Sequence, residues 1–250
     1  MNNKVDIENS GETCVIIPTY NNASTLANVV ADVLRYIPHI ILVDDGSTDA
    51  TGKLLQDFKN IEIISYHPNR GKGYALKKGF ALASSLGFRY AITIDADGQH
   101  LASDIPLFLE QIKKTPDSLI IGSRYLEQEN VPKQNRFANR FSNFWFKIHT
   151  LKSIPDTQSG FRLYPLVPLR KIKIFSTRYE MELELLVRSV WNFIPIVPIK
   201  ISVYYPPQNE RVSHFKPFQD FFRISILNTF LTFFAFFYFY PKFLFKKIRN

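Results

Sequence analysis

The stretch Tyr90-Ala-Ile-Thr-Ile-Asp95-Ala96-Asp97-Gly98-Gln99-His100 holds the pattern that decides the fold. Residues 90–94 are an apolar run with the length of a buried β-strand. Two carboxylates, Asp95 and Asp97, follow directly, and alternate residues on extended backbone point to the same side. Because open α/β sheets bind ligands beyond the carboxyl ends of their strands, we expect these carboxylates to face a ligand site.

Two carboxylates at this place suit one hard divalent cation, Mg²⁺ or Mn²⁺, which prefers oxygen ligands and keeps positions open for phosphates. We predict a metal site made by Asp95, Asp97 and Gln99, with His100 left out of the ligand set. Residues 95–98 would equally suit a surface turn. The pattern alone favours neither reading, and the rest of the chain favours the metal.

Short apolar runs alternate with helical patterns through the first half of the chain. The predicted strands cover residues 14–21, 39–43, 61–64 and 90–94, and the predicted helices cover residues 24–36, a segment through Leu54, Leu55 and Phe58 capped by Thr48 or Asp49, and a segment opened by residues 69–73. Strands and helices at this pitch predict an α/β fold with right-handed βαβ units. Continuous apolar strands predict a mostly parallel sheet flanked by helices on both faces.

Six short motifs occur in a fixed order between Cys14 and Arg162. They are Ile17-Pro18-Thr19-Tyr20-Asn21, Val43-Asp44-Asp45-Gly46-Ser47, Asn69-Arg70-Gly71-Lys72-Gly73, Asp95-Ala96-Asp97-Gly98-Gln99-His100, Gly122-Ser123-Arg124-Tyr125 and Asp156-Thr157-Gln158-Ser159-Gly160-Phe161-Arg162. In this set and order the chain resembles family 2 glycosyltransferases, which have a GT-A nucleotide-diphospho-sugar transferase fold. It is most similar to the dolichyl- or polyprenyl-phosphate hexose synthases, for mannose or glucose. One departure is Asn22, where that family often has Glu.

The resemblance implies a nucleotide-sugar donor, GDP- or UDP-hexose, bound near the first strand. The implied donor residues are Pro18, Thr19, Tyr20, Asn22, Asp45, Lys72, Asp95 and Ala96. Asp45 resembles the acid that hydrogen-bonds the base, whereas we assign Asp44 to capping the next turn. Lys72 opens a helix between two glycines, a place where backbone N–H groups and the lysine charge suit an anion. Asp97 would bind the metal directly, and Asp95 would reach it through water or touch ribose.

The second half of the chain supplies a possible acceptor site rich in arginine. Arg124 ends a predicted strand, Arg136 and Arg140 share one helix face, and Arg162 closes the last motif. Guanidinium groups suit phosphate because their planar fork donates several hydrogen bonds. We predict that these four residues read the phosphate of a polyprenyl (dolichyl or undecaprenyl) phosphate, and any one of them could instead belong to a solvated basic face.

A phosphate acceptor would need no general base, because a phosphomonoester is largely ionised at neutral pH. The reaction would then be one in-line displacement with inversion, with Asp95, Asp97 and Arg124 as catalytic residues. A hydroxyl of a cell-surface glycan or lipid-linked oligosaccharide is the alternative acceptor and would need a carboxylate base. Glu180 and Glu182 are the candidates for that base, with Glu182 preferred, and both would also fit the polar face of a surface helix.

The block from Tyr204 to Phe215 contains Arg211 and His214. In related synthases a basic loop here closes over the diphosphate, so Arg211 is predicted to contact the donor from a lid. Arg211 is the better match of the two residues, and His214 is assigned no catalytic role.

The composition fits a protein that works at a membrane. The net charge is +9, but no nucleic-acid-binding motif accompanies it, so we expect anionic lipid as the partner rather than nucleic acid. The single cysteine, Cys14, excludes an internal disulfide and fits a reducing cytoplasm. The N-terminal residues have no signal-peptide pattern. A non-catalytic membrane-bound sugar-nucleotide-binding protein is the alternative from another functional class.

The C-terminal segment differs in kind from the rest. Residues 224–240 are almost free of charge and crowded with Phe, with basic residues on both sides. We predict a GT-A catalytic domain over residues 1–215 and a membrane-attachment segment over 216–250, at the cytoplasmic face. A helix in the membrane plane keeps both basic flanks at the headgroups; a single span and a buried core helix are the alternatives.

Overall fold

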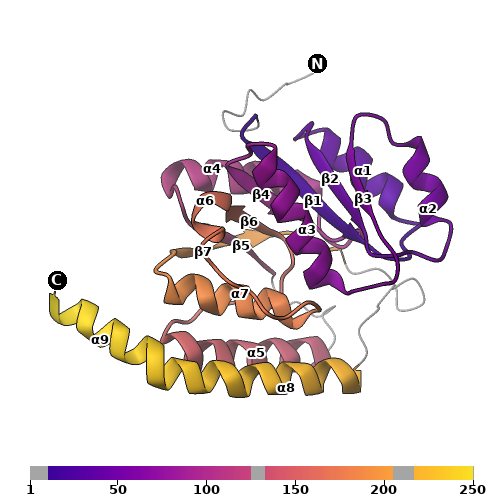
Figure 1. Cartoon of the computed structure of the whole chain (residues 1–250). Helices are drawn as coiled ribbons and strands as arrows, with labels where there is room; N and C mark the ends of the chain where they lie inside the picture. Colours follow the sequence, from indigo (N-terminus) through magenta and orange to yellow (C-terminus); the bar gives the residue numbers. More distant parts are fainter. Residues whose placement is uncertain (1–10, 125–132, 205–216, 250) are drawn as a thin grey trace.

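The computed structural model describes residues 11–124, 133–204 and 217–249 (Figure 1). Its centre is a seven-stranded sheet in the order β3-β2-β1-β4-β6-β5-β7. The strands are β1 (Thr13–Thr19), β2 (Ile40–Asp44), β3 (Glu62–Ser65), β4 (Tyr90–Thr93), β5 (Leu119–Arg124), β6 (Arg162–Pro165) and β7 (Ile196–Ile201). All neighbouring strands are parallel except β6, which runs antiparallel to β4 and β5. The prediction of a mostly parallel α/β sheet is confirmed.

Helices cover both faces of this sheet. They are α1 (Leu26–Leu34), α2 (Thr51–Leu54), α3 (Lys72–Ser85), α4 (Ile105–Lys114), α5 (Lys133–Thr150), α6 (Leu166–Leu169), α7 (Glu180–Trp191), α8 (Pro217–Phe234) and α9 (Tyr240–Arg249). The helix predicted through Phe58 is shorter than expected, because α2 ends at Leu54 and a single 3₁₀ turn follows. Asp49 does hold the start of α2, since its Oδ1 accepts the N–H of Thr51 at 2.9 Å.

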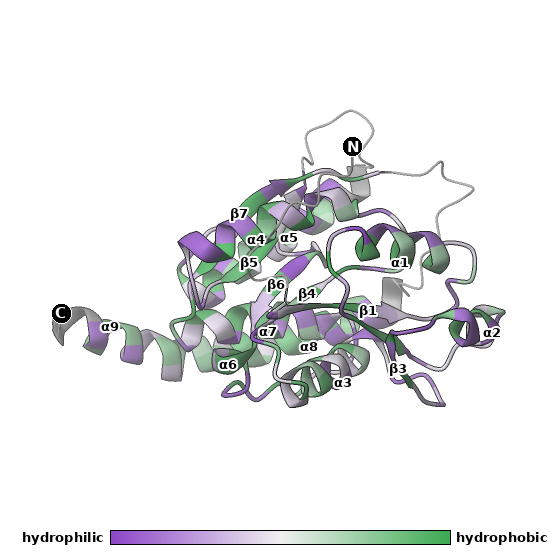
Figure 2. Cartoon of the chain, turned by 90° about the horizontal axis from the view of Figure 1, so that it is seen from above, coloured by the Kyte–Doolittle hydropathy of each residue, from purple (hydrophilic) through white to green (hydrophobic). Residues whose placement is uncertain are grey.

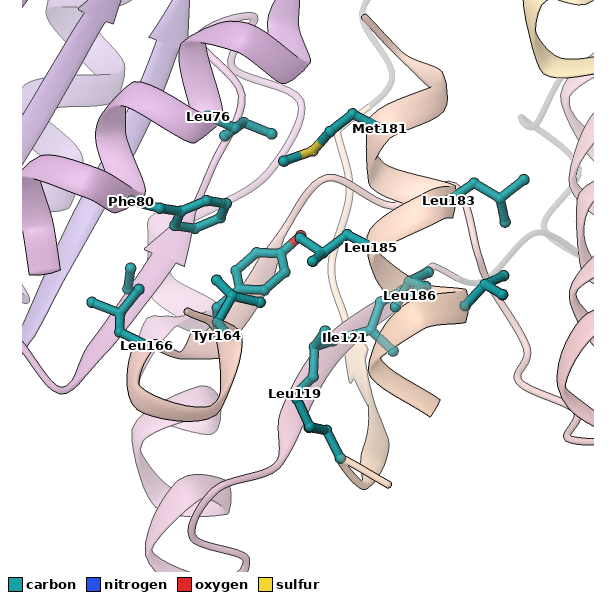
Figure 3. Packing of buried hydrophobic residues seen from close by; sticks show 14 of the residues in the cluster. Leu76, Phe80, Leu119, Ile121, Tyr164, Leu166, Met181, Leu183, Leu185 and Leu186 are labelled. Atoms are coloured by element: carbon teal, nitrogen blue, oxygen red, sulfur yellow. The ribbon is translucent and has the colours of Figure 1, made fainter. Parts of the chain in front are cut away.

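Two apolar cores lie on the two faces of the sheet. Alternate residues of β1 point into opposite cores, with Ile16 facing α3 and α7, and Ile17 facing α1 and α4. Figure 2 shows apolar residues along the strands and helices on either side of them. In the first core, Phe80 of α3 packs edge-on against Tyr164 of β6 at 4.9 Å between ring centroids (Figure 3). This packing fixes α3 and α7 relative to the strand ends.

The strand order reverses between β1 and β4. The chain leaves β1 for β2 and β3 on one side, then returns to place β4 on the other side of β1. The carboxyl ends of β1 and β4 therefore meet at the point where open α/β sheets bind ligands. Asp95 and Asp97 follow β4 at that point.

The C-terminal helix is packed along the rest of the molecule. From α8 a π-helical turn (Ala235–Phe239) continues into α9, and α8 lies beside α5 and below α7 in Figure 1. Leu231, Ala235 and Phe239 are buried in the same core as α7. The segment predicted to begin at residue 216 is thus in contact with the domain along α8. Its helix over Gln219–Lys246, 28 residues, is also long and apolar enough to cross a membrane, with a mean hydropathy of 1.5 in an 18-residue stretch.

Candidate active site

A partly buried lysine joins two carboxylates at the carboxyl edge of the sheet. The Nζ of Lys72, the first residue of α3, lies 2.7 Å from Oδ1 of Asp95 and 2.9 Å from Oε2 of Glu182 on α7. Burial alone would lower the pKa of Lys72, but the two carboxylates outweigh it and raise that pKa above its usual value. Three residues predicted for the site are therefore brought together, and Lys72 is bound to carboxylates rather than free to meet an anion.

Asp97 completes the acidic part of the site. Its Oδ1 accepts the backbone N–H of Gln99 at 3.0 Å. Burial, together with the negative charge of Asp95, raises the pKa of Asp97 to about 6. Burial also acts to raise the pKa of Asp95, but Lys72 and the other neighbouring cations lower it overall.

This cluster has the charge and the ligand chemistry for one divalent cation. At neutral pH, Lys72 contributes one positive charge and Asp95, Asp97 and Glu182 contribute three negative ones, so a divalent cation would neutralise the set. Within residues 11–124, 133–204 and 217–249 no group of three or more His, Cys, Asp or Glu side chains is placed to hold a metal. The cation would take its remaining oxygen ligands from water and phosphate, which fits Mg²⁺ or Mn²⁺. Gln99 lies beside the pair, and its carbonyl accepts the N–H of Tyr204 at 2.9 Å.

His100 packs beside the site rather than facing a metal. It is buried against Phe161, with ring centroids 5.4 Å apart. Burial lowers the pKa of His100 to about 4, so the imidazole is neutral at pH 7. A groove of about 700 Å³ lies between α1, with Asn28 in its wall, and the segment that carries Asp97 and His100, with Tyr204 also in its lining.

The two aspartates at the end of β2 hold loops. Asp44 accepts the N–H of Ser47 at 2.9 Å, so the predicted turn cap is confirmed. Asp45 is buried, and its two oxygens accept the N–H groups of Arg70 and Gly71, each at 2.7 Å. We expected backbone N–H groups beside Lys72 to bind a phosphate of the nucleotide sugar, but these groups donate to Asp45. Asp45 is the residue that we expected to bind the nucleotide base.

The turn after β1 is held by Asn22. Its Oδ1 accepts the N–H of Tyr20 at 3.2 Å and the hydroxyl of Thr19 at 3.4 Å, and its side chain is buried. An amide thus stabilises the turn at the position where the resembling family often has Glu. Pro18 and Thr19 lie at the end of β1, and the carbonyl of Ala96 accepts the hydroxyl of Thr25 at 2.6 Å.

The four arginines predicted for the acceptor are placed very differently. Arg124 is held by Asp156, with Nε 2.7 Å from Oδ2 and Nη2 3.1 Å from Oδ1. Arg136 is half-buried and Arg140 is exposed, both on α5. Asn139 lies between them and donates to Asp156 at 2.6 Å, so the start of α5 is tied to the residue that holds Arg124.

Arg162 is a correction to the prediction. It is fully buried, and it donates to the carbonyls of Ser159 at 2.6 Å, Thr157 at 2.9 Å and Glu182 at 2.9 Å. A guanidinium whose donors satisfy buried backbone carbonyls is not presented to a ligand. Arg162 therefore holds the polypeptide around the site and does not bind the acceptor.

The surface-helix reading of α7 is also wrong. Glu180, Glu182 and Glu184 are all buried. Glu184 accepts the N–H groups of Phe175 and Ser176 and pairs with Arg188 at 2.6 Å. Glu182 pairs with Lys72, and its other oxygen, Oε1, has no hydrogen-bond partner within the described residues. The spacing of these glutamates gave no indication that Glu182 pairs with a lysine from a distant part of the chain.

Glycines let the site close tightly. A Cβ on Gly160 would lie 2.7 Å from Oδ2 of Asp95 and 2.8 Å from Nζ of Lys72. A Cβ on Gly73 would lie 2.5 Å from Cβ of Met181. In the sequence these glycines are recognisable only as parts of motifs. The position of Gly73 directly after Lys72 is a sign that the backbone packs closely there. Arg211 lies outside the described residues.

Comparison with known proteins places the chain in a family. Residues 14–172 match the model of "Glycosyl transferase family 2". The chain belongs to glycosyl transferase family 2. It is a glycosyltransferase, so the non-catalytic alternative is set aside, and the predicted resemblance is confirmed.

The chain is similar in sequence to named relatives and in fold to a solved structure. The chain is 30% identical over 203 residues to the polyprenol monophosphomannose synthase of Mycolicibacterium smegmatis, covering 76% of each protein. It is 29% identical to the dolichyl-phosphate beta-glucosyltransferase of Saccharomyces cerevisiae, covering 75% of this chain and 65% of that protein. The glucosyl-3-phosphoglycerate synthase of Mycobacterium tuberculosis, in complex with Mn²⁺, uridine-diphosphate and phosphoglyceric acid, superposes with a TM-score of 0.63 at 17% identity, covering 91% and 81% of the two chains. The GT-A fold is confirmed.

Proposed function

We propose that this glycosyltransferase moves a hexose from a nucleoside-diphosphate sugar to a polyprenyl phosphate. The names of the relatives, which include a polyprenol monophosphomannose synthase and a dolichyl-phosphate glucosyltransferase, support a lipid phosphate. The observation that carries the choice of acceptor is the ion pair between Glu182 and Lys72. That pair engages Oε2, and the other oxygen, Oε1, is buried and has no hydrogen-bond partner among the described residues. Neither oxygen of Glu182 is therefore presented to a hydroxyl acceptor, whereas a phosphate acceptor needs no base.

On the donor side, Asp95 and Asp97 would hold Mg²⁺ or Mn²⁺, with Gln99 as a further oxygen ligand. The cation, when bound, stabilises the negative charge that develops on the departing nucleoside diphosphate. The end of β1 lies beside β4, which leads into Asp95, and Tyr20, which follows β1, would receive the nucleoside. Lys72 keeps Asp95 in place, and Glu182 keeps Lys72 in place.

On the acceptor side, Arg124, Arg136 and Arg140 would orient the lipid phosphate. One phosphate oxygen forms a bond to the anomeric carbon as the bond from that carbon to the diphosphate oxygen breaks. The electron pair of the broken bond leaves with the nucleoside diphosphate, and the configuration at the anomeric carbon inverts. Arg211 would cover the diphosphate from the segment between β7 and α8.

The C-terminal helix would attach the enzyme to the cytoplasmic face of the membrane. Its length and mean hydropathy support a membrane role, and the lipid acceptor requires one. The helix is packed against α5 and α7, so it would attach the catalytic domain directly rather than through a free linker.

The decisive experiment compares two lipids that differ only in the phosphate. Purified enzyme with Mn²⁺ and a panel of UDP- and GDP-hexoses is given either a polyprenyl phosphate or the matching polyprenol. We expect product from the polyprenyl phosphate with one nucleotide sugar and none from the polyprenol. Transfer to the polyprenol, or to a glycan hydroxyl but not to the phosphate, would contradict the proposal.

A further inference from the structure

Helix α5 presents its apolar residues to the outside. Phe137 and Phe144 are 73% and 56% exposed, and Leu151, directly after the helix, is exposed too. These residues are spaced by seven and therefore lie along one face, together with the basic residues Arg140 and Lys147. The opposite face, packed on the protein, buries Phe146 together with the polar side chains Asn139, His149 and Thr150. A helix whose outer face is in water has polar residues on that face, so the outer face of α5 is inverted.

Helix α8 has an inverted outer face too. Its inner side buries Asp220 and Asn228 together with Leu231, whereas Phe222, Phe230 and Phe237 are 65%, 60% and 72% exposed. Phe237 lies in the π-helical turn. Phenylalanines along the outer side indicate that the outer surroundings of this helix are not water alone.

The two inverted faces meet. Phe137 stacks on Phe141 with ring centroids 6.5 Å apart, and Phe141 contacts Phe221 of α8 at 6.2 Å. Figure 1 shows α5 and α8 side by side along the lower side of the molecule. We call this surface the aromatic face; its exposed residues are Phe137, Phe144 and Leu151 near α5, and Phe221, Phe222, Phe230 and Phe237 near α8.

We propose that α5 and α8 together bind flat on an anionic lipid bilayer, so that α5, within the catalytic domain, is itself a membrane-binding element. Phenylalanines that enter the acyl boundary beside Arg140 and Lys147 at the headgroups match such a surface in both polarity and charge. The burial of Asp220 and Asn228 argues against α8 crossing the bilayer, because a crossing helix would have to leave the domain and expose both residues to lipid. This inference extends the membrane attachment proposed above and does not depend on which acceptor is used.

The arrangement links membrane binding to the site. Asn139 on the inner face of α5 donates to Asp156, and Asp156 holds Arg124. The outer face of the same helix carries Phe137, Phe144 and Arg140. The membrane surface and Arg124 are thus on two sides of one helix, which would bring a lipid phosphate to the site at headgroup height.

Depth measurement on the full-length protein tests the flat orientation. Cys14 is buried, and burial raises the pKa of its thiol to about 12, so spin labels can be directed to new cysteines. Variants Phe144→Cys, Phe222→Cys and Phe237→Cys are labelled and bound to vesicles of phosphatidylcholine and phosphatidylglycerol. We expect the three labels at one shallow depth. A crossing helix would separate the labels at positions 222 and 237 by about 22 Å, and a label at position 144 that stays in water would remove α5 from the interface.

Vesicle flotation without any nucleotide sugar tests the contribution of α5. Phe137→Ser combined with Phe144→Ser should lower the partition coefficient at least tenfold. The matched control is Phe175→Ser, another strongly exposed phenylalanine outside the aromatic face, which should leave partition unchanged. Activity on a water-soluble short-chain acceptor should be kept, which shows that the double variant is folded. Unchanged partition would overturn the proposal, as would a wild-type dimer that the double substitution converts to monomer, since that would assign the face to a second copy of the chain.

Discussion

The two sides of the site hold charge in opposite ways. On the donor side, carboxylates are held by backbone N–H groups, as Asp45 is by Arg70 and Gly71. On the acceptor side, guanidinium groups are held by oxygen, as Arg124 is by Asp156 and Arg162 is by three carbonyls. A carboxylate or guanidinium group that is held in this way does not bind a ligand simply because it lies near the site. Only side chains that these networks leave accessible can bind substrate, which separates Arg136, Arg140 and the partly exposed Arg124 from the fully buried Arg162.

The largest expected effect is the loss of Asp97. In Asp97→Asn the amide oxygen can still accept the N–H of Gln99, so the fold should persist while one metal-binding charge is lost. We expect turnover to fall by roughly three orders of magnitude, since a metal contributes several kcal/mol to such a transition state. Initial rates with Mn²⁺, beside circular dichroism spectra, measure this. Near-normal rates in the variant would remove Asp97 from the metal site.

Arg162→Met tests the assignment of this arginine to the scaffold. It leaves three buried carbonyls without their partner, so the free energy of unfolding should fall by about 3 kcal/mol or more. Urea unfolding measures this change, and Arg136→Ala is the control, since its half-exposed side chain should alter stability by less than about 1 kcal/mol. Equal stability of the two variants would show that Arg162 is not a structural residue.

Glu182→Gln distinguishes a positioning residue from a base. If Glu182 acts through Lys72, the variant should lose about 10–100-fold in rate, as is usual when a residue that supports a metal ligand is altered. Its affinity for Mn²⁺, measured by calorimetry, should weaken as well. A rate loss as large as that of Asp97→Asn with unchanged Mn²⁺ affinity would instead favour a base.

Arg136→Ala should weaken the acceptor more than the donor. Removal of a charge-assisted hydrogen bond costs about 1.5–3 kcal/mol, which corresponds to a rise of roughly 10–100-fold in KM for the lipid phosphate. Arg136 is preferred to Arg124 here, because Arg124→Ala would leave the buried Asp156 without its partner. The same rise in KM for the nucleotide sugar would contradict an acceptor role.

The smallest effect concerns pH. The folded-state pKa of Asp97, about 6, lies above the ordinary value of 3.8. As pH falls through 6 a proton competes with the metal, so Mn²⁺ affinity should drop by up to about tenfold per pH unit. The stability of the metal-free protein should instead fall as pH rises. The raised pKa of Asp97 favours folding below about pH 4, and this contribution is lost as pH rises through 6. Asp97→Asn should flatten both profiles, and unaltered profiles in that variant would assign the titration elsewhere.

Features set by neighbouring residues could be predicted from the sequence. The turn cap by Asp44 depends on residues three positions away, and the strands that carry Asp95 and Asp45 are continuous apolar runs. Arg162 could not be placed, because its burial follows from the antiparallel insertion of β6 between β4 and β5. The pairing of Lys72 with Glu182 joins residues 110 positions apart in the chain, and the sequence motif around each is compatible with an exposed side chain.

The inverted helices illustrate the same limit. The apolar tail was noticed because residues 224–240 lack charge, but α5 mixes Phe with Arg, Lys and Asn, and its pattern does not say which face is outside. Only packing against α7 and α8 shows that Asn139 points in and Phe144 points out. Removing the tail would also expose Leu231, Ala235 and Phe239, so point substitutions are the better probes of membrane binding.

The contact at Gly73 has a mechanical consequence. The backbone of α3 approaches the start of α7 so closely that a methyl group would not fit, and the N–H of Tyr74 donates to the carbonyl of Thr177 at 2.7 Å. This bond fastens the segment that carries Lys72 to the segment that carries Glu182. The junction between these two segments is therefore a poor place for a hinge. We expect the floor of the site to keep its shape while substrate and product exchange.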